Sequence, residues 1–152
     1  METTTYKNYI DGKWRDSISN KTFLNINPAN KEEVIGYFQQ SSVEDVRKAI
    51  ESANRAFEEW RRYPPTTNPS RSVPECVLLK ERKENIARDL TLEEGKTLGE
   101  SEAEVESAIK EMEFQIGEGQ RIFGKSSPSE KEKVFSYTMR QPLGVVSILS
   151  PW

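Results

Sequence analysis

The sequence predicts an α/β fold, and three observations support this prediction. Strand and turn signals alternate over residues 9–38. Apolar residues then recur at three- and four-residue spacing in three stretches between residues 43 and 116, which is typical of amphipathic helices. A nearly unbroken apolar run closes the sequence at residues 143–152 and is typical of a parallel strand buried on both faces. Short strands, surface helices and a buried parallel strand together indicate an α/β protein.

A hairpin and two further short strands are predicted before the first helix. Asp11-Gly12 favours the positive φ angles of a two-residue turn, so Tyr9 to Trp14 should form a hairpin. Residues 23–26 and 34–38 are rich in β-branched and aromatic residues, and the cluster Asn27-Pro-Ala-Asn30 between them is typical of a turn. A small β layer is therefore expected at the start of the fold.

The first helix is predicted over residues 43–62. Ser42 and Asp45 have the spacing of a capping box, in which each side chain bonds the backbone N–H of the other residue. One face of this helix is apolar and comprises Val46, Ile50, Ala53, Phe57 and Trp60. A second helix is predicted over residues 77–94 with Gly95 as its C-cap, and a third over residues 100–116.

Two further strands are predicted near the end of the sequence. A polar connection at residues 125–131 precedes residues 134–139, which alternate in the manner of a strand. Residues 145–149 should form the buried strand, which looks like the first strand of a nucleotide-binding sheet. A parallel strand needs a crossover helix and partner strands after it. The sequence is therefore interpreted as the front part of a larger enzyme.

Composition excludes several classes of partner. A formal net charge of −3, with 22 basic and 25 acidic side chains, provides no excess that would attract nucleic acid or anionic lipid. No stretch approaches the roughly 20 apolar residues of a membrane span, and the first residues lack the layout of a signal peptide. The single cysteine excludes an intrachain disulfide, so a reducing, cytoplasmic location is expected. With 34% hydrophobic and 31% charged residues, the core should be small.

Candidate reacting groups are few. The absence of histidine excludes a Ser–His or Cys–His nucleophilic pair and a histidine metal site. Cys76 is interpreted as incidental rather than nucleophilic, because no histidine is available to activate it. Glu93 and Glu94 are interpreted as solvated charge rather than an acid–base pair. Gly117-Glu-Gly119 ends a helix instead of linking a strand to one, so it is not interpreted as a phosphate loop. No catalytic or metal-binding residue is predicted.

Several segments, taken in order, resemble the N-terminal third of the NAD(P)-dependent aldehyde dehydrogenase superfamily, and nearest among its members are those that oxidise semialdehydes or glyceraldehyde. The resemblance covers nearly the whole sequence, and the last segment is the most diagnostic. The segments are Asn8-Tyr-Ile-Asp-Gly-Lys-Trp14, Asn25-Ile-Asn-Pro-Ala29, Val34-Ile-Gly36, Ser42-Val-Glu-Asp-Val46, Phe57-Glu-Glu-Trp60, Leu92-Glu-Glu-Gly-Lys96, Gly117-Glu-Gly119, Arg140-Gln-Pro-Leu-Gly-Val-Val146 and Ser150-Pro-Trp152.

The resemblance implies a fold and a division of the chain. Residues 1–132 would supply the hairpin and helices of a Rossmann-like cofactor-binding domain. Residues 133–142 would supply a strand of the β oligomerisation arm, and residues 143–152 the first central strand of the cofactor-binding sheet. The chain would thus be a truncated α/β, aldehyde dehydrogenase-like domain.

The resemblance also implies a reaction, which is oxidation of a small aldehyde by NAD or NADP through a cysteine thioester. Ser150, Pro151 and Trp152 match family positions that line the nicotinamide-ribose end of the cofactor. The catalytic cysteine, the glutamate and the oxyanion-holding asparagine would lie in later sequence, the asparagine directly after Trp152. The chain alone is therefore expected to be inactive, and the complete enzyme to be a homo-oligomer such as a dimer or tetramer.

Two alternatives remain open. In some members a monovalent cation lies near the positions that match Asn25, Ile26 and Glu93. The chain could also exist by itself, as a non-catalytic fragment or subunit that pairs with a full-length dehydrogenase.

The segment between residues 64 and 77 departs from the family pattern. Four of the eight prolines fall here, and a proline inside a helix removes a hydrogen bond and costs about 3 kcal/mol. The first turns of the second helix should therefore be lost. A compensated frameshift or a sequencing error is one hypothesis for the origin of this segment.

Overall fold

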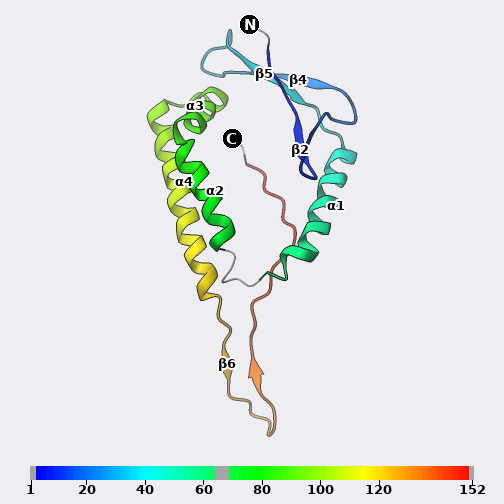
Figure 1. The fold of residues 1–152 in the computed structure, drawn as a ribbon, viewed down its shortest axis with the longest axis vertical. Helices are drawn as coiled ribbons and strands as arrows, with labels where there is room; N and C mark the ends of the chain where they lie inside the picture. The colour runs from blue at the N-terminus through cyan, green and yellow to red at the C-terminus, as the bar shows by residue number, and fades with distance from the viewer. Residues whose placement is uncertain (1–2, 64–68, 151–152) are drawn as a thin grey trace.

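The computed structural model describes residues 3–63 and 69–150, which form a β layer, a single helix, a group of three helices and a long arm (Figure 1). The N-terminal strands are β1 (Thr5–Tyr6), β2 (Asn8–Ile10), β3 (Lys13–Arg15), β4 (Thr22–Ile26) and β5 (Val34–Gln39). The helices are α1 (Val43–Trp60), α2 (Pro69–Glu81), α3 (Lys83–Glu94) and α4 (Leu98–Glu118), followed by the 3₁₀ turn η2 (Gly119–Arg121) and the arm strands β6 (Ser126–Ser127) and β7 (Ser136–Tyr137).

The predicted hairpin is confirmed. Strands β2 and β3 pair antiparallel, with Tyr9 opposite Trp14. The turn residues Asp11 and Gly12 have φ angles of 58° and 71°, as a two-residue turn of this kind requires. The Tyr9 and Trp14 rings lie 4.9 Å apart on an exposed face of the hairpin.

The two other predicted strands form a three-stranded sheet with a strand that the sequence did not predict. Its order is β1-β5-β4, with β4 antiparallel and β1 parallel to β5. Strand β1 is only two residues long, too short to show an alternation. Gly36 makes the parallel pairing possible, because a Cβ there would lie 2.6 Å from Tyr6 Cε2 and 2.8 Å from the Thr4 carbonyl oxygen.

Helix α1 begins where the capping box predicts. The Asp45 backbone N–H donates to Ser42 Oγ, and the Ser42 backbone N–H donates to Asp45 Oδ2 at 2.8 Å. The apolar face is not covered as an amphipathic helix would require, since Val46 is 53% and Ile50 48% exposed.

The three helices α2, α3 and α4 enclose the apolar core of the described residues. Cys76, Ala87, Val105 and Ile109 are buried there, one or two from each helix. Gly95 ends α3 in the left-handed conformation, at φ 85°, as predicted. The second predicted helix is divided in two at Arg82, and the third extends at both ends of the predicted range.

The prediction that prolines abolish the first turns of the second helix is wrong from Pro69 onwards. Helix α2 begins at Pro69, where a missing backbone N–H is tolerated because the first N–H groups of a helix have no intrahelical partner. Pro74 lies inside the helix and gives up one backbone hydrogen bond. Residues 64–68 lie outside the described part of the chain.

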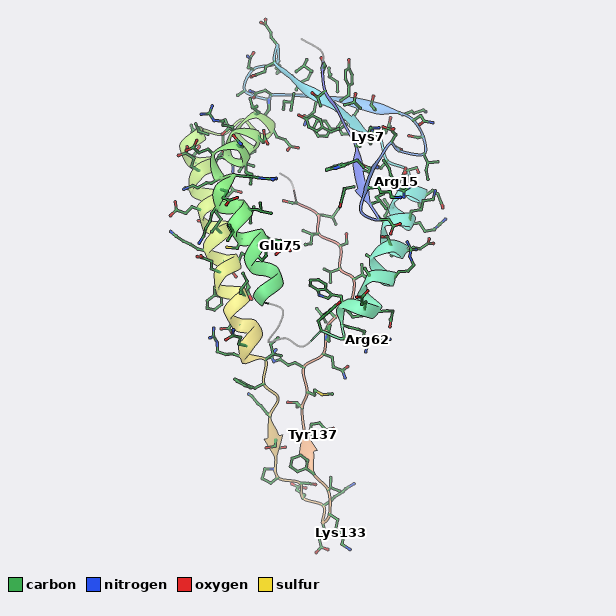
Figure 2. The ribbon with its side chains drawn as sticks, in the orientation of Figure 1. Lys7, Arg15, Arg62, Glu75, Lys133 and Tyr137 are labelled. Carbon is green, nitrogen blue, oxygen red and sulfur yellow. The ribbon has the colours of Figure 1, made fainter. Side chains whose placement is uncertain are left out.

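The strand predicted at residues 134–139 is shorter in the structure and forms a hairpin, which was not predicted. Only Ser136 and Tyr137 of the predicted strand at 134–139 are strand residues, and they pair with Ser126 and Ser127, which fall in the predicted polar connection. The arm extends away from the helices, with Lys133 near its tip (Figure 2).

The buried strand predicted near the end of the sequence does not form in this chain. Residues 143–150 are not in a strand, and Leu143, Ile148 and Leu149 are 95%, 84% and 94% exposed. A strand needs backbone partners, and none of the described strands pairs with this segment.

Candidate functional site

The predicted cofactor-binding residues lie at the end of the exposed segment 143–150. Ser150 is exposed, and Pro151 and Trp152 lie outside the described residues. In the view of Figure 1, this segment runs between α1 and the helices α2 and α4. Near its start, a Cβ on Gly144 would lie 3.9 Å from Phe57 Cε1 of α1. The start of the segment therefore lies beside Phe57 of α1.

The side of α1 that carries Phe57 is the apolar face predicted from the sequence. Val46, Ile50 and Phe57 recur at helical spacing, and Phe57 is the half-buried member next to Gly144. Val46 and Ile50 on this face are exposed, and so are Val146 and Ile148 of the segment. The described residues therefore leave apolar side chains of both α1 and the segment open to water, although large apolar patches are rarely exposed on soluble proteins.

The described residues do not form a dinucleotide site by themselves. Only one strand leads directly into a helix in the described ranges, at residues 40–42 between β5 and α1, and this turn contains no glycine. At the start of α1 the capping box occupies the Ser42 and Asp45 backbone N–H groups, and it places the Asp45 carboxylate where a pyrophosphate would have to bind. Of the predicted cofactor set, the described residues supply only the Ser150 hydroxyl.

A cleft of about 320 Å³ lies between β5 and α3. It is lined by Tyr6, Glu33, Val34, Ile35, Phe38, Asp89, Leu92 and Glu93. Glu93 is one of the three positions considered for a monovalent cation, with Asn25 and Ile26. The turn that follows Asn25 and Ile26 reaches the end of α3, where a Cβ on Gly95 would lie 2.9 Å from Pro28 Cγ. Among residues 3–63 and 69–150, no group of three or more acidic, cysteine or histidine side chains is arranged to hold a metal ion.

Glu93 and Glu94 do not act as a pair. Glu93 is exposed at the cleft, as predicted, whereas Glu94 forms an ion pair with Lys96 Nζ at 2.6 Å and its side chain is 27% exposed. Lys96 also contacts Glu104 of α4. This cluster fixes the turn between α3 and α4, so Glu94 is a structural carboxylate and not solvated charge.

Cys76 is buried among Ala87, Val105 and Ile109, with 5% exposure. The interpretation that it is not a nucleophile agrees with this position, because a buried thiol among apolar side chains is neither accessible nor activated.

A buried polar cluster joins the β layer to α1, and the sequence indicated only its capping pair. Ser17 Oγ donates to Asp45 Oδ2 at 3.0 Å, and the Ser17 backbone N–H donates to Gln39 Oε1 at 2.8 Å. The Ser42 backbone N–H, the Ser42 hydroxyl, the Ile18 backbone N–H and the Ser17 hydroxyl hold the pKa of Asp45 well below its usual value. The cluster aligns structural elements and contains no group poised for chemistry.

Comparison with known proteins decides the family. The sequence model described as "Aldehyde dehydrogenase family" matches residues 14–152. The chain belongs to this family. An aldehyde dehydrogenase fold is also found by structural comparison: the betaine aldehyde dehydrogenase of Staphylococcus aureus, solved in complex with NAD+, has a TM-score of 0.83 and 32% identity, over 90% of this chain and 28% of that chain.

Sequence relatives in the family act on semialdehydes. The α-ketoglutaric semialdehyde dehydrogenase of Bacillus subtilis is 36% identical over 151 residues, which are 99% of this chain and 31% of that protein. The succinate-semialdehyde dehydrogenase [NADP(+)] 2 of Schizosaccharomyces pombe is 34% identical over 96% of this chain and 30% of its own length. The chain thus spans less than a third of the length of these aldehyde dehydrogenases.

No helix of the described ranges, 3–63 and 69–150, combines the length and apolar character that a membrane crossing needs.

Proposed function

We propose that this chain is part of an enzyme that oxidises an aldehyde to a carboxylate with NAD+ or NADP+, and that the 152-residue chain is inactive by itself. The observation that carries this proposal is the family match over residues 14–152. The described residues contain no accessible cysteine thiol and no dinucleotide turn, which supports inactivity of the chain alone.

Within such an enzyme, the chain would contribute scaffold rather than reacting groups. Residues 1–132 would form the hairpin and helices of the cofactor-binding domain, and residues 143–152 its first central strand. The exposed apolar side chains of residues 143–149 favour this role, because they suit a strand that is covered on both faces. Ser150, Pro151 and Trp152 would then line the nicotinamide-ribose end of the cofactor, beyond the carboxyl end of that strand.

The substrate would be a small semialdehyde, the class on which the relatives from B. subtilis and S. pombe act. The complete enzyme would work in the cytoplasm as a homo-oligomer, and residues 133–142 would take part in its arm. Phe135 and Tyr137 stack at 5.7 Å on this arm and are 75% and 64% exposed, which suits a contact between subunits.

Three measurements test the proposal. Calorimetric titration of the purified chain with NAD+ and NADP+ should detect no binding in the micromolar range. Spectrophotometric assays with α-ketoglutaric and succinic semialdehydes should show no cofactor reduction, with the B. subtilis enzyme as positive control. Co-expression with the part of the B. subtilis enzyme that this chain does not match should yield a complex that reduces the cofactor. Turnover by the chain alone would contradict the proposal.

The exposed arm also supports a second candidate function, in which the chain is a non-catalytic subunit that pairs with a full-length dehydrogenase. Exposed strand edges and aromatic side chains favour such pairing. Co-expression with the full-length B. subtilis enzyme distinguishes the two functions. Co-elution without a requirement for the complementary part would favour the subunit, whereas activity gained only with that part would favour the first function.

A further inference from the structure

We propose that the chain contains two separate cooperative units, and that the helical unit is the more stable of the two. The helical unit comprises α2, α3 and α4, residues 69–118, and the N-terminal unit comprises β1 to β5 and α1, residues 3–63. The helical unit would stay folded under conditions that unfold the N-terminal unit. This inference does not depend on the proposed enzymatic activity.

The apolar core lies entirely in the helical unit. Every hydrophobic side chain that is buried in the described residues comes from α2, α3 or α4. Leu79, Ile86, Leu90, Met112 and Ile116 of the same helices pack against these buried side chains. Because hydrophobic burial is the main favourable term in folding, this unit has its own source of stability.

Polar contacts between helices reinforce the same unit. Ion pairs tie α4 to the preceding helices, as Lys80 of α2 contacts Glu113 and Lys83 of α3 contacts Glu106 at 2.8 Å. Ser101 is fully buried, and its hydroxyl accepts a hydrogen bond from Thr91 Oγ1 of α3 at 2.8 Å. All of these contacts begin and end within residues 69–118.

The N-terminal unit is held by different forces. Apart from Gly36, its buried residues are polar, namely Ser17, Asn27, Gln39 and Asp45. Its large apolar side chains remain substantially exposed, as for Phe23 at 51% and Leu24 at 43%. Hydrogen bonds contribute a modest net free energy per bond, since the unfolded chain bonds to water instead. This unit should therefore be the weaker one.

Contact between the two units is limited. The turn at Pro28 and Ala29 approaches Gly95 at the end of α3. Beside this contact, the cleft of about 320 Å³ separates β5 from α3. A small and imperfectly packed contact transmits little stability from one unit to the other, so their unfolding should be weakly coupled.

Hydrogen exchange of the complete 152-residue chain, measured by mass spectrometry over a urea series, tests this inference. We expect amides of the N-terminal unit to lose protection at lower urea than amides of α3 and α4. The wild-type chain alone can decide the question. Loss of protection in both units at the same urea concentration would overturn the inference.

Two variants sharpen the test. Ile109→Ala removes a side chain that is 5% exposed in the helical core and should accelerate exchange in α3 and α4 by roughly 100-fold. Ser17→Ala removes the hydroxyl that bonds Asp45 and should accelerate exchange in the N-terminal unit by roughly 5-fold. Each variant should leave the other unit within about 2-fold of wild type, as expected for uncoupled sites. An equal acceleration of both units by either variant would show a single cooperative unit.

Discussion

Replacement of Gly36 by alanine should destabilise the N-terminal sheet through one added carbon atom. The new Cβ would lie 2.6 Å from Tyr6 Cε2 and 2.8 Å from the Thr4 carbonyl oxygen. The Tyr6 ring can turn away, but the Thr4 carbonyl belongs to the backbone that pairs with β5. Strand β1 must therefore move away from β5.

The size of the effect follows from the contacts that β1 makes. The Tyr37 backbone N–H donates to the Thr4 carbonyl at 2.9 Å, and the loss of such a bond costs about 1 kcal/mol. The Tyr6 and Phe38 rings stack at 4.7 Å, and such a pair contributes about 1 kcal/mol. We expect a loss of about 2 kcal/mol in the free energy of unfolding of the N-terminal unit, or about 1 M in the urea midpoint.

Tryptophan fluorescence in urea can measure this loss, because Trp14 and Trp60 both lie in the N-terminal unit. The measurement is made in a Trp152→Phe background, so that both emitting residues belong to that unit. Gly99→Ala is the matched control, since nothing lies within 4 Å of the Cβ that would be added in α4. Because Gly99 lies in the helical unit, the control should leave this fluorescence midpoint unchanged. An unchanged midpoint for Gly36→Ala would refute the argument that the parallel strand depends on this close approach.

Three further predictions concern the arm, the helices and the cap of α1. Gly124→Ala should open the base of the arm, because a Cβ there would lie 1.9 Å from the Thr138 carbonyl oxygen; exchange of the Thr138 amide should accelerate while the helices keep their protection. Glu106 has a pKa lowered from 4.5 to about 2 by its two lysine partners, so its stabilising contribution should be present above pH 4.5 and lost as the pH falls through about 2. Acid titration followed by circular dichroism checks this, and Glu106→Gln should remove that part of the pH dependence. Ser42→Ala should cost about 1 kcal/mol through loss of the N-cap, and Ser42→Thr, which keeps the hydroxyl, should recover most of it in urea unfolding.

Elements with a local signal could be predicted from the sequence. The Asp11-Gly12 turn, the cap at Ser42 and the C-cap at Gly95 all form as predicted, because each depends on residues only a few positions apart. Family membership was also evident, since many short segments in a fixed order are specific together.

Elements that depend on distant partners could not be predicted. Strand β1 pairs across thirty-two positions, with Thr5 opposite Tyr37, and its two residues carry no pattern of their own. The apolar run at residues 143–149 shows a preference for a covered strand, but pairing depends on neighbours that the run itself does not specify. The start of α2 differs from the prediction because proline breaks a helix only in its interior, whereas Pro69 occupies the first helical position.

The candidate site was predicted less completely than the fold. The role predicted for Ser150 rests on the resemblance alone, and the polar cluster at Ser17 and Gln39 had no sequence signal beyond the capping pair. Such clusters arise from three elements meeting in space, which spacing along one element does not reveal.

The close approach at Gly124 makes the base of the arm a tight contact between its two backbone strands. One side of the hairpin continues from α4 and the other leads to residues 143–150, and the two sides meet at this narrow base, where the Thr138 N–H also donates to the Lys125 carbonyl; Lys133 lies near the far tip (Figure 2). Because the arm is long, a small rotation of the backbone at this base would displace the tip by a much larger distance. A bulkier residue at Gly124 would have to displace the backbone at Thr138, and this would change the direction of the whole arm.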